Sequence, residues 1–236
     1  MSEYKMGNYS IKEVQAKMLE ILIEVDRICR KHNIKYILDG GTMLGAVRHK
    51  GFIPWDDDLD IALLRNDYDK LIEVCKTELG EEFVFQHYKS EKLYPLHFGK
   101  IKIKNTKYVE SDYRNLNINH GVYIDVFPID YINPRTKHFQ FKYISFIYGI
   151  RLKKIGFDIS GRKLWKRFMM NVFSVLPFSI INKWSENVMK LNNKKNSDLV
   201  NKVCHPGSIR PDYPRDIYTD VIELEFEGHK FFVPKN

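Results

Sequence analysis

The sequence has few cysteines, few acidic residues in its middle part and no long uninterrupted apolar run. Cys29, Cys75 and Cys204 are odd in number and form no Cys-x-x-Cys pair, which argues against a disulfide or zinc framework and for a reducing compartment. The longest mostly apolar stretch, Phe168 to Ile181, is broken by polar residues and a proline and is too short to span a bilayer. The first thirty residues lack the apolar centre of a signal peptide. We therefore expect a cytoplasmic protein, either soluble or peripheral at the inner face of the cell membrane.

The residues that are present predict a folded chain with one strongly basic segment. The 236 residues are 44% hydrophobic and 14% aromatic, enough to build a packed core. The net charge is +8, but residues 131–195 hold fourteen Lys and Arg against two Asp and Glu, so this segment carries the whole excess. Such a basic block usually faces a polyanion, which is a nucleic acid, an anionic membrane or a phosphate-bearing substrate.

The pattern of apolar residues predicts an α/β (α+β) fold with a mixed sheet. A capping box at Ser10–Glu13 and apolar residues at helical spacing predict a helix to about His32, and Asn66 is predicted to cap another helix that ends near Leu79. Short strands are expected at residues 36–38, 59–63, 83–87, 98–104 and 122–127. We expect a single catalytic domain over residues 1–236, with a core at 10–130, a basic helical segment at 131–203 and a C-terminal hairpin at 217–234.

A cluster of carboxylates is the strongest functional signal. If the stretch is a strand, Asp56, Asp58 and Asp60 point to one face, because residues two apart share a face. Like charges so placed need compensation, which a hard cation such as Mg²⁺ provides. Asp125 lies inside an apolar strand and adds a further carboxylate. The plainer alternatives are a solvated acidic turn for the first group and a backbone contact at a strand end for Asp125.

A glycine turn precedes these carboxylates. Gly40, Gly41 and Thr42 follow a predicted strand and open a helix that reaches Arg48. Paired glycines let backbone N–H groups approach a ligand, and a helix N-terminus favours phosphate. Arg48 can bind phosphate oxygens through two donors. Taken alone, the glycine pair is more often a simple tight turn.

Three stretches together closely resemble the LicD family. They are Gly40-Gly41-Thr42-x-Leu44-Gly45-x-x-Arg48, then Ile53-Pro54-Trp55-Asp56-Asp57-Asp58-Leu59-Asp60-Ile61, and then Gly121-Val122-Tyr123-Ile124-Asp125-Val126-Phe127-Pro128-Ile129-Asp130. That family includes bacterial phosphocholine transferases, is related to fukutin and fukutin-related protein, and looks like a branch of the DNA polymerase beta-like nucleotidyltransferase superfamily. The resemblance is good over about residues 10–130 and loose beyond. Family members usually continue into a segment with Tyr-Gly-Asp-Tyr, whereas this sequence ends at Asn236.

The resemblance implies a metal-dependent phosphotransferase. It moves a phosphorylated small alcohol, phosphocholine from CDP-choline for example, to a hydroxyl of a glycan such as teichoic acid, lipopolysaccharide or capsule. The implied metal ligands for Mg²⁺ or Mn²⁺ are Asp56, Asp58, Asp60 and Asp125, and the implied catalytic residues are Asp58, Asp60, Asp125 and Arg48. The implied substrate-binding residues are Gly40, Gly41, Thr42, Arg48, Lys100 and Lys102. Asp125 would also accept the proton of the acceptor hydroxyl.

Two further questions stay open at this point. The basic segment, with Trp165 beside Lys163, Lys166 and Arg167, is either a surface for anionic membrane and a lipid-linked acceptor or an ordinary amphipathic helix with solvated lysines. Rival functions are a nucleotidyltransferase that adds a nucleoside monophosphate to a small molecule or protein, and a non-catalytic nucleic-acid-binding module. Because no nucleic-acid-binding motif is present, we expect no nucleic acid as a partner.

Overall fold

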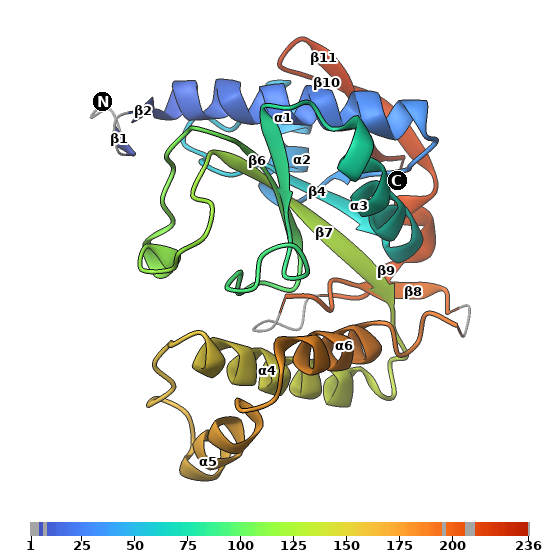
Figure 1. Ribbon diagram of the computed structural model, residues 1–236. Helices are drawn as coiled ribbons and strands as arrows, with labels where there is room; N and C mark the ends of the chain where they lie inside the picture. Colours follow the sequence, from blue (N-terminus) through green and yellow to red (C-terminus); the bar gives the residue numbers. More distant parts are fainter. Residues whose placement is uncertain (1–4, 7–8, 195–196, 206–210, 236) are drawn as a thin grey trace. The chain divides into compact units, whose positions relative to one another are not determined.

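A computed structural model describes residues 5–6, 9–194, 197–205 and 211–235 (Figure 1). The chain forms two compact units. The first contains Met1–Gln86, Gly99–Pro128 and Arg215–Asn236, and the second contains His87–Phe98 and Ile129–Pro214. The first unit holds every residue that the sequence assigns to the candidate site.

The first unit contains three α-helices among its described residues, and local sequence signals predicted the starts of two of them. They are α1 (Ile11–Lys31), α2 (Gly40–His49) and α3 (Arg65–Glu78), together with two short 3-10 helices at Ser111–Tyr113 and Arg215–Tyr218. The capping box is confirmed, since Ser10 Oγ accepts from Glu13 N at 3.3 Å and Glu13 Oε2 accepts from Ser10 N at 2.7 Å. The prediction that Asn66 caps α3 was wrong. Strand β4 runs directly into the helix at Leu64, so Asn66 lies in the first turn.

A mixed sheet forms the centre of this unit, and the predicted α+β class is confirmed (Figure 1). Its strand order is β3-β4-β7-β6-β5, with bounds Ile37–Leu38, Asp60–Leu64, Tyr123–Tyr131, Gly99–Ile103 and Phe83–Gln86. The pairs β3/β4, β5/β6 and β6/β7 are antiparallel. From Ile129 onwards β7 belongs to the second unit. The two-residue strands β1 (Lys5–Met6) and β2 (Tyr9–Ser10) pair separately.

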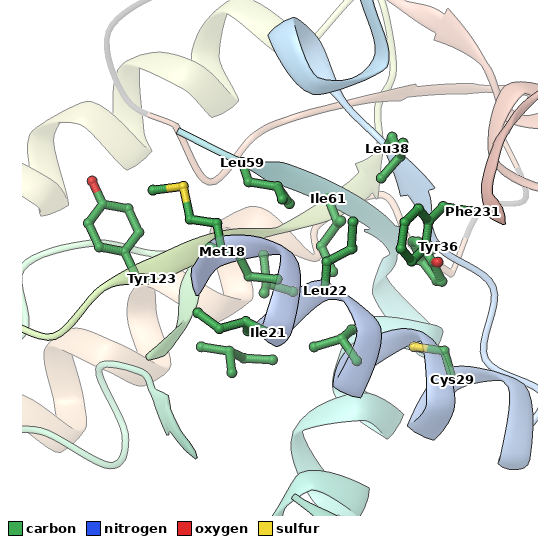
Figure 2. Packing of buried hydrophobic residues seen from close by; sticks show 14 of the residues in the cluster. Met18, Ile21, Leu22, Cys29, Tyr36, Leu38, Leu59, Ile61, Tyr123 and Phe231 are labelled. Atoms are coloured by element: carbon green, nitrogen blue, oxygen red, sulfur yellow. The ribbon is translucent and has the colours of Figure 1, made fainter. Parts of the chain in front are cut away.

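The core of the first unit lies between α1 and the sheet. Met18, Ile21 and Leu22 project from α1 toward Leu59 and Ile61 (Figure 2), and all five side chains are fully buried. Full burial of such a side chain stabilises the fold by about 1.5–3 kcal/mol. Because successive strand residues face opposite sides, Asp60 points away from the side on which Leu59 and Ile61 pack. The helix therefore occupies one side of β4 and leaves the carboxylate on the other.

The predicted C-terminal hairpin is confirmed. Strands β10 (Val221–Phe226) and β11 (His229–Pro234) pair antiparallel around Glu227 and Gly228. Both turn residues have positive φ, 50° and 76°, as a two-residue hairpin turn of type I′ requires. The buried side chains of the hairpin join the core beside α1.

The second unit is built on helices, as the sequence of residues 131–203 predicts. They are α4 (Lys137–Lys154), α5 (Leu164–Phe173) and α6 (Phe178–Met189), followed by the short strands β8 (Leu199–Asn201) and β9 (Tyr213–Pro214). Its own small core consists of Ile147, Ile150, Ile159, Met170 and Ile181.

A buried arginine ties the helices of this unit to residues 92–94. Arg151 Nε donates to Tyr94 O at 2.9 Å and Nη1 donates to Asn182 Oδ1 at 2.5 Å. Burial lowers the pKa of Arg151 to about 10, so the side chain stays charged at neutral pH. In the part of the chain that is described, no helix is both long enough and apolar enough to cross a membrane.

Candidate active site

The loop that carries the acidic motif, residues 51–59, is fixed by side chains from distant parts of the first unit. Gln15 Nε2 on α1 donates to Ile53 O at 3.2 Å and to Asp56 O at 2.8 Å. Glu227 Oε1, in the hairpin turn, accepts from Phe52 N at 2.9 Å. These contacts hold the backbone on which the carboxylates stand. We call residues 51–59 the carboxylate loop.

Neither of these two residues was predicted from the sequence. Gln15 is buried within the apolar stripe of α1, and a polar residue in such a stripe needs a hydrogen-bond partner, so this signal was available. Glu227 gave no comparable signal, because its partner is a backbone group 175 positions away.

The carboxylates come together in a way that strand alternation does not explain. The prediction that Asp56 and Asp58 stand on a strand was wrong, since β4 begins at Asp60 and both residues precede it in the loop. Their side chains nevertheless lie close enough to interact with each other. Burial and the neighbouring Asp56 and Asp57 raise the pKa of Asp58 to about 6, while Lys100 acts in the opposite direction. The loop thus crowds like charges that a cation would relieve.

The glycine turn touches this cluster directly. Gly40 has φ +55° and opens α2, and a Cβ at this position would lie 3.3 Å from Asp60 Oδ2. A Cβ at Gly41 would lie 2.6 Å from Asp56 Oδ2, closer than real Cβ contacts come. The two glycines therefore make room for two carboxylates at the N-terminus of a ten-residue helix.

Thr42 is buried and links the glycine turn to the sheet. Its Oγ1 accepts from Asp60 N at 2.9 Å, and Asp39 N donates to Asp60 O at 2.9 Å. These bonds fix the start of α2 against the first residue of β4. The structure therefore gives Thr42 a role in positioning Asp60, whereas direct contact of Thr42 with substrate stays a prediction.

A buried lysine connects the second acidic strand to the cluster. Lys100 on β6 and Asp125 on β7 are register partners, and Lys100 Nζ lies 2.7 Å from Asp125 Oδ1 and 3.0 Å from Glu110 Oε1. The same ammonium lies 3.4 Å from the centre of the Tyr123 ring, a favourable cation–π contact. Burial raises the pKa of Asp125, while the ion pair with Lys100 lowers it. Asp58 also raises the pKa of Asp125, so these two carboxylates interact electrostatically.

The second predicted lysine has a different partner. Lys102 Nζ is buried and donates to Asn119 O at 2.6 Å, which holds the chain just before the Asp125 strand. Tyr108 acts similarly on the carboxylate loop, where its hydroxyl donates to Asp57 Oδ2 at 3.3 Å. The sequence did not identify Glu110, Tyr108 or Asn119, because the contacts of these residues depend on how the connection between β6 and β7 folds.

Arg48 is exposed in the last turn of α2. Seven residues of helix place it about 10 Å along the axis from Gly41, and seven residues are nearly two whole turns, so both lie on one stripe of the helix. Gly45, between them on that stripe, lies against Gly51 and Ile53 of the carboxylate loop. No residue that the structure describes pairs with the Arg48 guanidinium. It is therefore free to meet an anion at the rim of this loop.

The described residues do not form a ready-made metal cage. No group of three or more His, Cys, Asp or Glu side chains among them is arranged to hold an ion. Mg²⁺, however, is usually held by one or two carboxylates together with substrate phosphates and water. Asp56 and Asp58, in mutual contact beside the glycine turn, fit that smaller ligand set. Asp125 is engaged by Lys100, so its assignment as a metal ligand stays a prediction.

Comparison with known proteins gives a consistent result. Residues 33–147 match the family model described as LicD/FKTN/FKRP, nucleotidyltransferase domain. The lipopolysaccharide cholinephosphotransferase LicD of Haemophilus influenzae is 28% identical over 243 residues, which cover 97% of this chain and 87% of that protein. The human ribitol 5-phosphate transferase FKRP is 28% identical over 79 residues, 34% of this chain and 16% of that protein. An uncharacterized protein of Rickettsia typhi is 43% identical over 68 residues, 28% of this chain and 22% of that protein. The matched residues 33–147 contain the glycine turn, the carboxylate loop, Lys100 and Asp125.

Proposed function

Because the chain carries a LicD-family domain and is a LicD-type phosphotransferase, we propose that it moves a phosphorylated small alcohol from a nucleoside diphosphate donor to a glycan hydroxyl. The donor we favour is CDP-choline, with phosphocholine as the transferred group, since the similarity to the Haemophilus influenzae cholinephosphotransferase extends over 97% of the chain. The acceptor is then a cell-surface glycan such as teichoic acid, lipopolysaccharide or capsule. Glycerol phosphate, ribitol phosphate and phosphoethanolamine are the other groups to test.

One observation carries the proposal more than any other. The glycine turn at the N-terminus of α2 makes room for the carboxylates of Asp56 and Asp60, so a phosphate seat and an acidic cluster share one small region. Backbone N–H groups at a helix start bind phosphate oxygens, and glycines allow close approach. A diphosphate bound there lies next to oxygen ligands for its accompanying metal ion.

The metal ion of this proposal is Mg²⁺, with Mn²⁺ as a substitute. Asp56 and Asp58 would hold it, with Asp60 at the edge of the same turn. When bound, such an ion neutralises phosphate charge and orients the phosphorus for in-line attack. Its charge also relieves the repulsion that raises the pKa of Asp58.

The residues of β6 and β7 supply the proton acceptor. In the proposed reaction the acceptor hydroxyl oxygen forms a bond to the phosphorus that carries the alcohol, and the bond from that phosphorus to the nucleoside monophosphate breaks. The hydroxyl proton passes to a carboxylate oxygen of Asp125. Lys100 favours the ionised form of Asp125, against the effect of burial, and orients the carboxylate through the 2.7 Å ion pair. Arg48, which pairs with none of the described residues, binds phosphate oxygens of the donor.

The products distinguish this reaction from nucleotidyl transfer. The purified protein is incubated with Mg²⁺ and a panel of CDP- and UDP-linked alcohols, with a glycan acceptor, and released nucleotides are measured by chromatography. We expect CMP from the preferred CDP-linked donor, no release in EDTA, and none from Asp58→Asn. Release of the phosphorylated alcohol, with CMP attached to the acceptor, would instead establish a nucleotidyltransferase. Release that continues in EDTA would remove the metal from the mechanism.

A further inference from the structure

Helix α5 is anchored to its own unit through one side only. Met170 is fully buried, and a Cβ added to Gly149 of α4 would lie 2.4 Å from Met170 Cε, so the missing side chain at Gly149 lets the two helices approach closely. Phe173 packs between Phe146 and Trp184, with ring centres 6.3 Å and 5.7 Å away. This side of α5 therefore has its full set of apolar partners.

The opposite side of α5 is also apolar, and it is exposed. Leu164, Trp165, Phe168 and Val172 are 79%, 61%, 66% and 48% exposed. At about 100° per residue these four side chains fall within an arc of about 100°, centred opposite Met170. We call them the α5 apolar face. A soluble surface seldom gathers large apolar side chains on one helix without a purpose, since their exposure to water is unfavourable.

Most of the charges in the segment that contains this face are positive. Lys166 and Arg167 belong to α5 and Lys163 immediately precedes it, and α4 and α5 contain no acidic residue. All three cations lie outside the apolar arc; Arg167 is the nearest to its edge, and Lys163 and Lys166 lie toward the Met170 side. Two carboxylates occur in residues 131–194, and both have partners of their own. Asp158 accepts from Ser160 N at 2.8 Å, and Glu186 pairs with Lys89 and accepts from the Tyr88 hydroxyl. The helix thus offers an exposed apolar face within a segment of strongly positive net charge.

We infer that the α5 apolar face docks on the surface of an anionic lipid bilayer, with α5 lying in the plane of the interface. Leu164, Trp165, Phe168 and Val172 would enter the boundary between head groups and acyl chains, while the long Lys and Arg side chains of the segment extend toward the lipid phosphates. An indole suits this boundary because its ring is apolar and its N–H is polar. The inference goes beyond the proposed reaction and does not depend on it, because it concerns α5 and not the carboxylate site.

Sedimentation with vesicles tests the inference on the full chain. Two vesicle types are used, phosphatidylcholine alone and phosphatidylcholine with phosphatidylglycerol in a ratio of about 7:3, since binding through such a surface needs anionic lipid. We expect binding to the anionic vesicles, weakening with salt, and a blue shift of tryptophan emission that Trp165→Phe removes. The double variant Phe168→Ser/Val172→Ser should lose binding by about tenfold or more. Its matched control, Leu191→Ser/Ile222→Ser, changes exposed apolar residues elsewhere and should bind like the parent.

Charge is tested separately. Replacing Lys163, Lys166 and Arg167 with Gln should release the protein from anionic vesicles, whereas replacing Lys12, Lys230 and Lys235 with Gln removes the same charge from the first unit and should not. The thermal midpoint of every variant is measured, and Trp165→Phe serves as a conservative apolar variant that should keep most of the binding. Binding that survives Phe168→Ser/Val172→Ser would reduce the effect to simple electrostatic adsorption and overturn the inference. So would a parent protein that ignores the vesicles, or one that covers this face by forming a dimer in solution.

Discussion

Substituting Asp58 by Asn should make the folded protein more stable while abolishing transfer. In the folded protein, burial and the carboxylates of Asp56 and Asp57 raise the pKa of Asp58 from 3.8 to about 6. In the unfolded chain Asp58 ionises at its ordinary value. Above about pH 4, ionisation of Asp58 therefore stabilises the unfolded state, whereas in the folded state the same group ionises only near pH 6. This destabilisation is fully present above about pH 6, and it disappears as the pH falls below about 4.

The size of the effect follows from the pKa shift. A shift of about two units corresponds to at most about 3 kcal/mol, at roughly 1.4 kcal/mol per unit. Because the Asp58 side chain is only partly shielded from solvent, screening reduces this to an expected gain of about 1 kcal/mol for Asp58→Asn at pH 7.5. For a chain of this length, 1 kcal/mol corresponds to a rise of roughly 2–4 °C in Tm.

Urea unfolding in EDTA at pH 7.5 and pH 5 measures the gain, with Asp112→Asn as a control for loss of an exposed carboxylate. We expect Asp58→Asn to be more stable than the parent at pH 7.5, with a smaller difference at pH 5, and Asp112→Asn to match the parent at both. A variant that is less stable than the parent at pH 7.5 would show that the cluster is not strained. Unchanged turnover and Mg²⁺ dependence in Asp58→Asn would refute the assignment of this residue to the metal.

Four further substitutions test other parts of the site. Gly41→Ala should lower turnover at least about tenfold with little loss of Tm, because its Cβ displaces the short Asp56 side chain. Gly45→Ala should instead lower Tm, because its Cβ would lie 2.5 Å from the backbone oxygen of Gly51. CMP release and thermal melting compare the two variants. Arg48→Lys should raise the KM for the donor several-fold without changing Tm, since lysine lacks the planar pair of donors, and an unchanged KM would place the phosphate elsewhere. Lys100→Met should cost about 3 kcal/mol in urea unfolding, because it leaves the partly buried Asp125 and Glu110 without their cation, and a stable, active variant would contradict the role given to this ion pair.

Elements with a strong local signal could be predicted from the sequence. Helix α1 has both a capping box and an apolar stripe, and the structure starts it within one residue of the expected position. The hairpin at Glu227-Gly228 was also predictable, because two strand-like runs flank a two-residue turn that contains a glycine. The start of α3 was not, since a strand that continues directly into a helix leaves no capping signal at Asn66.

The site was predictable in its residue types but less so in its geometry. The acidic motif predicted a crowded group of carboxylates, and Asp56 and Asp58 are in contact. The expected cause, alternation along a strand, does not apply, because a loop fixed by Gln15 brings them together. The pairing of Lys100 with Asp125 depends on the register between β6 and β7, which a single sequence does not reveal. Long-range contacts of this kind explain why Glu110 was missed.

The electrostatics of the site indicate why donor and metal ion should bind together. Lys100 is one positive charge in contact with two carboxylates, those of Asp125 and Glu110, so this buried group retains a net negative charge. Asp56 and Asp58 add further negative charge nearby, and the raised pKa of Asp58 shows that their repulsion is not fully compensated within the protein. A diphosphate approaching alone would increase that repulsion. A divalent cation bound by Asp56 and Asp58 would offset most of this negative charge, so the affinity for the donor should rise with the Mg²⁺ concentration and, by linkage, the affinity for Mg²⁺ should rise with the donor.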